Sequence, residues 1–188
     1  MFKPAALVVA LTLLPLAGQA QTPPAAPAAC PALLQHTLPR LQDEKPQSLC
    51  QYAGRVLLVV NTASFCGFTP QYQGLEALHS KYRDRGLVVL GFPSNDFSQE
   101  TGSNQQIADF CESTFGVKLP MFTKTTVRGT QAHPFYKTLA QRTGQAPQWN
   151  FHKYLVGRDG NVVASYPSAT GPESRELVAA IEKQLLAK

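Results

Sequence analysis

Cys66 is the residue whose type and position could carry chemistry. It lies in NTASFCGFTPQY (residues 61–72), just after the apolar run 56–60 and just before a segment of helical periodicity. Thiol–disulfide enzymes carry a Cys-x-x-Cys pair at such a junction, but the second position here is Thr69. Free backbone N–H groups and the dipole at a helix N-terminus stabilise a thiolate. A single thiolate is enough to attack a hydroperoxide and become a sulfenic acid. A thiol that merely fills the core is the alternative.

Two strands and a helix must position this cysteine. Val56–Asn61 is a continuous apolar run of the kind that forms a strand buried on both faces, and Leu87–Phe92 is a second one. Between them, apolar residues recur at helical spacing from Tyr72 to Tyr82, and Arg85-Gly86 ends the segment. A strand, a helix and a strand in this order predict a βαβ unit with parallel strands.

A further helix and two short apolar segments are predicted around this unit. Ser103 and Gln106 form a capping-box pattern at the start of a helix that ends at Gly116. Leu33–Leu38 is expected to form a short strand. Leu119–Phe122 is short and apolar and contains a proline, which is typical of an edge or strand-entry position.

The C-terminal part predicts an antiparallel half-sheet and a last helix. The segments 151–156 and 161–166 flank Gly157-Arg158-Asp159-Gly160, which is a strong hairpin signal. Helical spacing of apolar residues extends from about Pro172 to Leu186. The sum is an α/β protein of thioredoxin-like architecture, with a mixed central sheet flanked by helices.

The N-terminal residues have the pattern of an export signal. Lys3 supplies a positive start, residues 5–16 an apolar run, and Gly18-Gln19-Ala20 a small-x-small ending. A buried N-terminal helix is the alternative. We therefore expect a signal peptide at 1–20, a Pro/Ala-rich leader at 21–31 and one domain at 32–188. The protein is expected to be exported, to a bacterial periplasm, without a membrane span, because no later apolar run is long enough.

Charge and histidine placement exclude several classes of function. The formal net charge is +5, and the basic residues are dispersed rather than clustered with aromatics, which argues against nucleic-acid binding. The four histidines are scattered, and no spacing with cysteine suggests a metal site. Cys30 and Cys50 precede the catalytic strand of an exported protein and invite a disulfide, with unpaired surface thiols as the alternative.

From about Gln47 to Leu186 the chain resembles the glutathione peroxidase family in its cysteine form. The stretches that carry the resemblance are NTASFCGFTPQY, GLVVLGFPSNDF, SQE, FGVKLPMFTK, AHPFY and WNFHKYLVGRDGNVV. The resemblance implies a modified thioredoxin fold and thiol-dependent reduction of hydroperoxides, without a cofactor. The segment between Tyr136 and Trp149 is short, so the chain is similar to compact members that lack the oligomerisation loop, and a monomer is expected.

The family motifs assign four catalytic residues by resemblance. Cys66 resembles the peroxidatic cysteine, Gln99 the Gln of the Q-E motif, and Trp149 and Asn150 the start of the W-N-F motif. The amide and indole N–H groups are neutral donors that can orient peroxide and stabilise thiolate. Core filling by Trp149 and a turn role for Asn150 are the alternatives.

The chain departs from the family pattern around Gln99. Asp96 replaces the Gln of the usual N-Q-F stretch and puts a carboxylate close to the site. The loop to Gln99 looks one residue shorter than usual, and Thr101 replaces a common Pro. These departures predict that Gln99 approaches Cys66 along a path that differs from the family pattern.

A sulfenic acid must be reduced again before the next cycle. Thioredoxin-dependent relatives use a second cysteine on the helix after the Q-E motif, and the candidate resolving residue here is Cys111. Because Cys111 shares an apolar face with Ile107 and Phe110, core filling is its alternative. A thioredoxin-like protein and glutathione are both candidate reductants.

Two other functions are possible on this fold. The first is an exported thiol–disulfide oxidoreductase, which the replacement of the second cysteine by Thr69 disfavours. The second is a redox-sensing or binding domain without catalysis, since fold alone does not fix function. The joint presence of Cys66, Gln99, Trp149 and Asn150 argues for the peroxidase.

Overall fold

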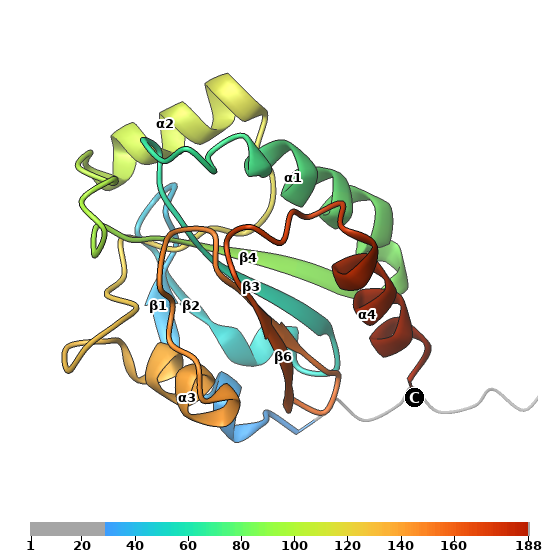
Figure 1. The fold of residues 1–188 in the computed structure, drawn as a ribbon. Coiled ribbons are helices and arrows are strands. Elements are labelled where there is room, and N and C mark those ends of the chain that lie inside the picture. Colours follow the sequence, from blue (N-terminus) through green and yellow to red (C-terminus); the bar gives the residue numbers. More distant parts are fainter. Residues whose placement is uncertain (1–28, 188) are drawn as a thin grey trace, which may run out of the picture.

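The computed structural model describes residues 29–187, and its centre is a four-stranded mixed sheet (Figure 1). The strands are β3 (Val56–Thr62), β4 (Leu87–Pro93), β5 (Lys153–Val156) and β6 (Val162–Tyr166), in the order β4-β3-β5-β6. Strands β3 and β4 are parallel, whereas β5 is antiparallel to both β3 and β6. The expected signal peptide (1–20) and the leader up to residue 28 lie outside the described residues.

Helices cover both faces of this sheet. Figure 1 shows α1 (Gln71–Tyr82) and α4 (Arg175–Leu186) on one side and α3 (Pro134–Thr143) on the other. Apolar side chains from α1, α4 and α2 (Asn104–Phe115) form one core cluster with alternate residues of β3. Side chains of α3 form a second cluster with the remaining residues of β3 and with the N-terminal segment. Every residue of β3 and β4 is buried because each strand is covered on both faces.

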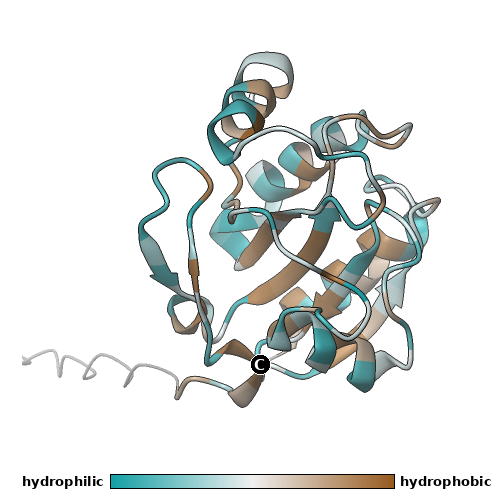
Figure 2. Ribbon diagram, turned by 90° about the vertical axis from the view of Figure 1, so that its left-hand side faces the viewer, coloured by the Kyte–Doolittle hydropathy of each residue, from teal (hydrophilic) through white to brown (hydrophobic). Residues whose placement is uncertain are grey.

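Hydropathy follows these layers. Figure 2 shows the apolar residues gathered on the central strands and the hydrophilic residues on the outer surfaces of the helices. The first βαβ unit that the sequence predicts is present, with α1 leading through a short turn to Gly86, whose φ of 110° only glycine adopts without strain. The predicted capping box is confirmed, because Ser103 and Gln106 bond to each other's backbone N–H groups. The unit therefore places the loop that carries Cys66 between the end of β3 and the start of α1.

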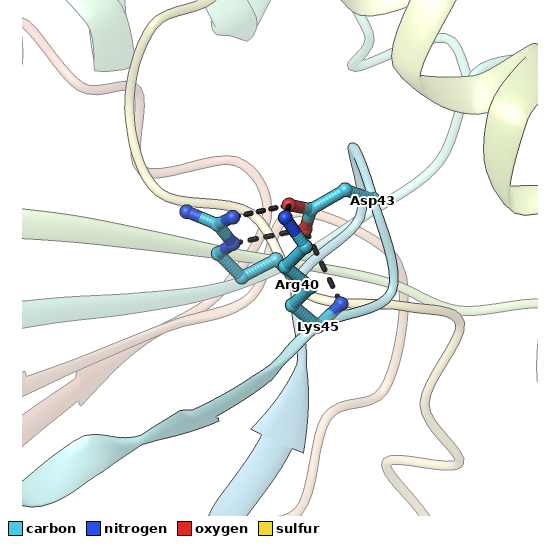
Figure 3. Close-up of polar contacts among 3 residues, drawn as sticks. All are labelled: Arg40, Asp43 and Lys45. Atoms are coloured by element: carbon cyan, nitrogen blue, oxygen red, sulfur yellow. Dashed lines mark hydrogen bonds and ion pairs between the residues drawn. The ribbon is translucent and has the colours of Figure 1, made fainter.

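A separate two-stranded ribbon packs beside the main sheet. Strands β1 (Thr37–Pro39) and β2 (Pro46–Ser48) pair antiparallel. At the turn between them, Arg40 and Lys45 both approach Asp43 (Figure 3), with Arg40 Nε donating to Asp43 Oδ1 at 2.9 Å and Lys45 Nζ 3.6 Å from Oδ2. The hydrogen bond from Arg40 lowers the pKa of the Asp43 carboxyl. These exposed pairs fix the turn geometry and contribute little to stability.

Of the two short apolar segments, the first differs from its predicted structure and the second lies at the sheet edge as predicted. Leu33–Leu38 is a strand only from residue 37, because Ala32–Leu34 forms a short 3-10 helix that buries Leu33 and Leu34. Leu119–Phe122 makes only isolated bridges, from Met121 to Gly91 and from Phe122 to Arg40.

Helix α3 was not predicted at all. It begins at Pro134, after His133, whose Nδ1 accepts the backbone N–H of Phe135 at 3.2 Å. Within residues 29–187, no helix has the length and apolar character needed to cross a membrane.

Candidate active site

Cys66 lies in a tight loop between β3 and α1. Its side chain is buried, with 7% of the residue exposed. The backbone N–H of Phe68 donates to its Sγ atom at 3.3 Å, which places a fixed donor against the sulfur. Such a donor stabilises negative charge on sulfur, because it needs no reorganisation when the charge forms.

The loop differs from the expected helix N-terminus. Helix α1 begins at Gln71, five residues after Cys66, and the intervening residues form successive turns. The Thr69 N–H bonds to the Cys66 carbonyl at 2.9 Å, and the Tyr72 N–H bonds to the Thr69 carbonyl at 3.0 Å. The donor on the sulfur is therefore a loop amide, and the helix dipole acts from one turn further away than the sequence suggests.

Thr69, at the position of the missing second cysteine, fastens the Cys66 loop. Its hydroxyl accepts the backbone N–H of Cys66 at 3.0 Å and donates to the carbonyl of Ala63 at 2.9 Å. The side chain is buried, so the two bonds satisfy polar groups that water cannot reach. Sequence reasoning noted only that Thr69 is not a cysteine. The available signal was a Thr three residues after Cys66, a spacing at which hydroxyls often bond to nearby backbone.

The structure brings Gln99 and Asn150 together beside this loop. Asn150 is fully buried, and its Nδ2 donates to Oε1 of Gln99 at 3.1 Å. The backbone carbonyl of Gln99 accepts the N–H of Phe65, the neighbour of Cys66, at 3.1 Å. Since the Gln99 side-chain oxygen is occupied, its NH2 group is the end that can donate to another partner. The shortened loop therefore still brings Gln99 to the Cys66 loop.

Trp149 lies at the surface next to this pair. The residue is 41% exposed, and its ring packs against Phe97 with the ring centroids 5.3 Å apart. Its backbone carbonyl accepts Nδ2 of Asn61 at 3.1 Å, and the carbonyl of Asn61 in turn accepts the N–H of Phe151 at 2.6 Å. Asn61 at the end of β3 therefore holds the Trp149–Phe151 segment. Among residues 29–187 no hydrogen bond joins the indole to Sγ of Cys66.

Phe151 adopts an unusual backbone conformation beside the site. Its φ is 64°, in the left-handed region that a bulky aromatic residue rarely enters. The ring is fully buried against Tyr72, with the centroids 5.4 Å apart. Strain of this kind persists where the surroundings enforce it, and it often marks functional sites. The positive φ turns the chain so that Asn150 faces Gln99 while Trp149 stays at the surface.

A buried carboxyl group also touches the Cys66 loop. Glu100 is fully buried, and the hydroxyl of Ser64 donates to its Oε2 at 3.0 Å. Burial raises the pKa of Glu100, although the bond from Ser64 acts in the opposite direction. The backbone N–H of Glu100 donates to Oδ1 of Asn95 at 3.0 Å. Glu100 thus anchors the Gln99 segment to the loop, a contact that sequence reasoning missed.

Asp96 does not direct its carboxylate at the cysteine. Its Oδ2 accepts the backbone N–H groups of Val127 at 2.7 Å and Arg128 at 3.1 Å. The carboxylate expected close to the site is therefore engaged by backbone N–H groups, and this oxygen holds the loop before α3. The guanidinium of Arg128 also lies over the ring of Phe97, 5.1 Å from its centroid.

Cys111 occupies the core side of α2. It is 2% exposed and belongs to the same apolar cluster as Cys66 and Ile107. Burial raises the pKa of the Cys111 thiol to about 11, while the nearby Tyr72 hydroxyl acts in the opposite direction. Both Cys66 and Cys111 are free thiols in this structure. Exposure of the Cys111 thiol to a partner protein would require local opening of α2.

The remaining cysteines are joined. Cys30 and Cys50 form a disulfide with their Cα atoms 5.1 Å apart. Cys50 lies in the short helix Leu49–Tyr52, directly before β3, so the bridge attaches the end of the leader to the domain. Within residues 29–187, no three His, Cys, Asp or Glu side chains lie close enough together to hold a metal ion.

Comparison with known proteins identifies the family. The family model for glutathione peroxidase matches residues 35–140, which include Cys66, Gln99 and Cys111 but end before Trp149. The chain is 47% identical over 143 residues to a glutathione peroxidase-like peroxiredoxin, gpx1, of Schizosaccharomyces pombe, covering 73% of this chain and 90% of the relative. It is 49% identical over 154 residues to a hydroperoxy fatty acid reductase, gpx1, of Synechocystis, covering 76% and 90%.

The fold is shared more widely than the sequence. A solved thiol:disulfide interchange protein of the thioredoxin family from Chlorobium tepidum superposes with a TM-score of 0.61 at 16% identity, covering 87% of this chain and 99% of that one. At this identity the likeness shows the thioredoxin-like fold alone. The sequence identity to the two relatives and the match to the family model show the family itself: the chain belongs to the glutathione peroxidase family.

Proposed function

We propose that this peroxidase reduces hydroperoxides with Cys66 as the attacking thiolate. The observation that carries the proposal is the geometry at its sulfur. The Phe68 N–H points at Sγ, Thr69 fastens the loop, and the Gln99–Asn150 pair lies beside it. In the reaction the sulfur bonds to the terminal peroxide oxygen and the O–O bond breaks. The remaining oxygen takes a proton and leaves as water or an alcohol, and Cys66 becomes a sulfenic acid.

The neutral donors around the cysteine would act on the oxygens of the peroxide. The free NH2 end of Gln99 and the indole N–H of Trp149 can hold the developing charge on the leaving oxygen. Asn150, fully buried, orients Gln99 through their hydrogen bond. These roles extend the family assignment to individual residues of this chain.

The reducing half of the cycle uses a thiol, and a thioredoxin-type protein fits the chain best. The relative from S. pombe carries the name peroxiredoxin. In this route, Cys111 attacks the sulfenic acid, the sulfur–oxygen bond breaks with release of water, and the resulting disulfide is reduced by the partner. Because Cys111 is buried, local opening of α2 is part of this route wherever the partner must reach the disulfide. In the other route, glutathione attacks the sulfenic acid directly.

Steady-state turnover with the two reductants separates these routes. The measurement is peroxide consumption with a thioredoxin system and with glutathione, for the wild type and for Cys111→Ser. Loss of thioredoxin-driven turnover in Cys111→Ser, with a Cys66–Cys111 linked peptide in the oxidised wild type, supports the thioredoxin route. Glutathione-driven turnover that is unaffected by the substitution, with no linked peptide, contradicts it.

We also propose where the protein acts, on the basis of its N-terminal export signal. We expect cleavage after residue 20 and action of the monomer in an oxidising compartment, a bacterial periplasm. The Cys30–Cys50 bridge agrees with such a compartment, because disulfides persist where thiols are not kept reduced. N-terminal sequencing and the native mass of protein recovered from a periplasmic fraction test this expectation. A cytoplasmic protein that retains residue 1 would contradict it.

A thiol–disulfide oxidoreductase is the rival function. It shares the fold, but Thr69 replaces the second active-site cysteine and its hydroxyl is committed to the loop. Reduction of insulin disulfides measured beside peroxide consumption distinguishes the two activities. The proposal expects rapid peroxide consumption and negligible insulin reduction.

A further inference from the structure

Lys153 places an amine inside the core, on the face of the sheet that supports the Cys66 loop. The residue is fully buried in β5. Its register partners on the two neighbouring strands, Val60 and Tyr166, belong to the apolar cluster that also contains Cys66. Residues directly opposite each other on paired strands project to the same face of the sheet. The amine is therefore enclosed among the apolar side chains of that cluster.

This buried amine has no acidic partner. In the part of the chain that the structure describes, no salt bridge joins Lys153 to a carboxylate. Burial lowers the pKa of Lys153 to about 7. Burying an amine without a carboxylate costs free energy that an apolar side chain of similar length would not cost. Packing of the core therefore does not explain why a lysine stands here, and the contact that its Nζ makes has to be considered.

The hydrogen bond of Nζ goes to the Trp149–Phe151 segment. Lys153 Nζ donates to the carbonyl of Phe151 at 2.7 Å. Phe151 has a φ of 64°, and its N–H donates to the carbonyl of Asn61 at 2.6 Å. Both polar groups of the Phe151 backbone are thus held, one from β3 and one from β5. A bulky residue stays in the left-handed region only where its surroundings enforce that conformation, so these two bonds account for the turn.

The turn at Phe151 controls the residue that precedes it. Asn150 is fully buried, and its Nδ2 donates to Oε1 of Gln99 at 3.1 Å. Rotation of the Phe151 backbone out of the left-handed region would turn Asn150 away from Gln99. Misplacement of a group at a reacting centre by about 1 Å can cost on the order of 100-fold in rate. A bond at the Phe151 carbonyl therefore acts on the reaction through Asn150.

We propose that Lys153 is a positioning residue for the peroxidase reaction, because its hydrogen bond to the Phe151 carbonyl holds the left-handed turn that aims Asn150 at Gln99. The inference rests on the proposed function and adds one residue to it. The chemistry at the sulfur is unchanged. An ammonium group and a neutral amine both donate N–H, so the role is the same in either protonation state.

Lys153→Met removes the donor and keeps a long, unbranched side chain. Stopped-flow oxidation of Cys66 by hydrogen peroxide should be about tenfold slower in this variant, because the Asn150–Gln99 pair is less well placed. Lys153→Gln retains an N–H donor at shorter reach and should give an intermediate rate. Leu155→Val is the matched control, since Leu155 is buried in the same cluster and makes no contact with the Phe151 carbonyl through a polar group. It should oxidise at the wild-type rate.

A double-mutant cycle separates positioning from a general weakening of the core. In an Asn150→Leu background, Lys153→Met should slow oxidation by less than about twofold, because the pair that it orients is already absent. The loss caused by Lys153→Met should be equal at about pH 6 and about pH 8, because both protonation states of the lysine donate. A wild-type rate in Lys153→Met, equal losses in the two backgrounds, or a loss at the lower pH that disappears at the higher one would each overturn the proposal.

Trp149 reports on the same segment without turnover, because it is the single tryptophan of the chain and directly precedes Asn150. In a Cys66→Ser background, acrylamide should quench its fluorescence more strongly in Lys153→Met than in the parent, since the segment is held less firmly. Leu155→Val should leave the quenching unchanged. Equal quenching in Lys153→Met and the parent would contradict the inference.

Failure of the inference and failure of the proposed function give different results. If Lys153 does not position the segment, Lys153→Met oxidises at the wild-type rate, while Cys66→Ser remains inactive. If Cys66 is not the attacking group, hydrogen peroxide consumption is unaffected by Cys66→Ser, yet the difference in quenching at Trp149 remains.

Discussion

The side-chain amide of Asn150 donates a hydrogen bond of 3.1 Å to the side-chain carbonyl of Gln99, although the two residues are 51 positions apart. Asn150 is fully buried, so its position is set by the fold rather than by solvent. The bond determines which end of the Gln99 amide faces outward. The donor group of Gln99 is thus oriented before any peroxide arrives, which is the condition for effective electrostatic stabilisation.

Asn150→Leu and Gln99→Ala should each slow the oxidation of Cys66 by hydrogen peroxide about 10- to 100-fold, because each removes one oriented donor or its support. The double variant should be little slower than the slower single variant, since the two residues act as one unit. Stopped-flow measurement of the second-order rate tests this. Fully additive losses would show that the residues act independently, and a wild-type rate in Gln99→Ala would remove Gln99 from the site.

Thr69→Val should loosen the Cys66 loop. The change keeps the side-chain shape but leaves the Cys66 N–H and the Ala63 carbonyl without partners, at a cost of about 1–3 kcal/mol in the free energy of unfolding. Peroxide oxidation of Cys66 should slow as well. Thr69→Ser retains the hydroxyl and should remain close to wild type in both urea unfolding and peroxide rate. Equal behaviour of the Val and Ser variants would contradict the role of the hydroxyl.

Lys153 should make stability depend on pH. It is fully buried in β5 and donates to the carbonyl of Phe151 at 2.7 Å. Burial lowers the pKa of Lys153 from 10.5 to about 7. Between these values the folded state binds fewer protons than the unfolded state, so the free energy of unfolding rises with pH through this window and falls as the pH drops towards 7.

Lys153→Met removes that titration. Relative to the parent protein, which retains the lysine, the variant's free energy of unfolding should rise less between pH 7 and pH 10, by about 4 kcal/mol at most from the size of the pKa change. Urea unfolding of both proteins in a Cys66→Ser background avoids oxidation of the reactive thiol at high pH. Parallel pH profiles for the two proteins would show that Lys153 does not titrate in this range.

The sequence was informative where one segment carries its own signal. Continuous apolar runs predicted β3 and β4, and the capping box predicted the start of α2. The site contacts that escaped prediction join residues far apart along the chain, such as Asn61 with Trp149 and Ser64 with Glu100. No local pattern encodes which distant backbone or side-chain group each will meet.

Helix α3 shows the same limit for a secondary-structure element. Its buried residues Phe135, Tyr136 and Leu139 are at helical spacing, but the helix has only 10 residues, from Pro134 to Thr143. A helix this short is marginal in isolation and depends on packing against the sheet. Its segment AHPFY resembles a family motif, and that resemblance alone predicts no secondary structure.

The bridge between Cys30 and Cys50 should survive in resting protein. Free-thiol titration of denatured protein from a periplasmic preparation should find two thiols, Cys66 and Cys111, in the absence of reductant. Replacing both bridged cysteines by serine should lower the free energy of unfolding by about 3 kcal/mol, as expected for a closed loop of roughly 20 residues. Four titratable thiols, or an unchanged stability in the double variant, would contradict a stabilising bridge.

The most direct test of the central claim is the fate of one equivalent of hydrogen peroxide mixed with fully reduced protein. The wild type and Cys111→Ser should consume it rapidly, and in Cys111→Ser a sulfenic acid should be trapped by dimedone on Cys66. Cys66→Ser should consume none at a comparable rate, because a serine hydroxyl is a far weaker nucleophile than a thiolate. Rapid consumption by Cys66→Ser, or trapping of the sulfenic acid on another residue, would contradict the assignment of Cys66 as the peroxidatic cysteine.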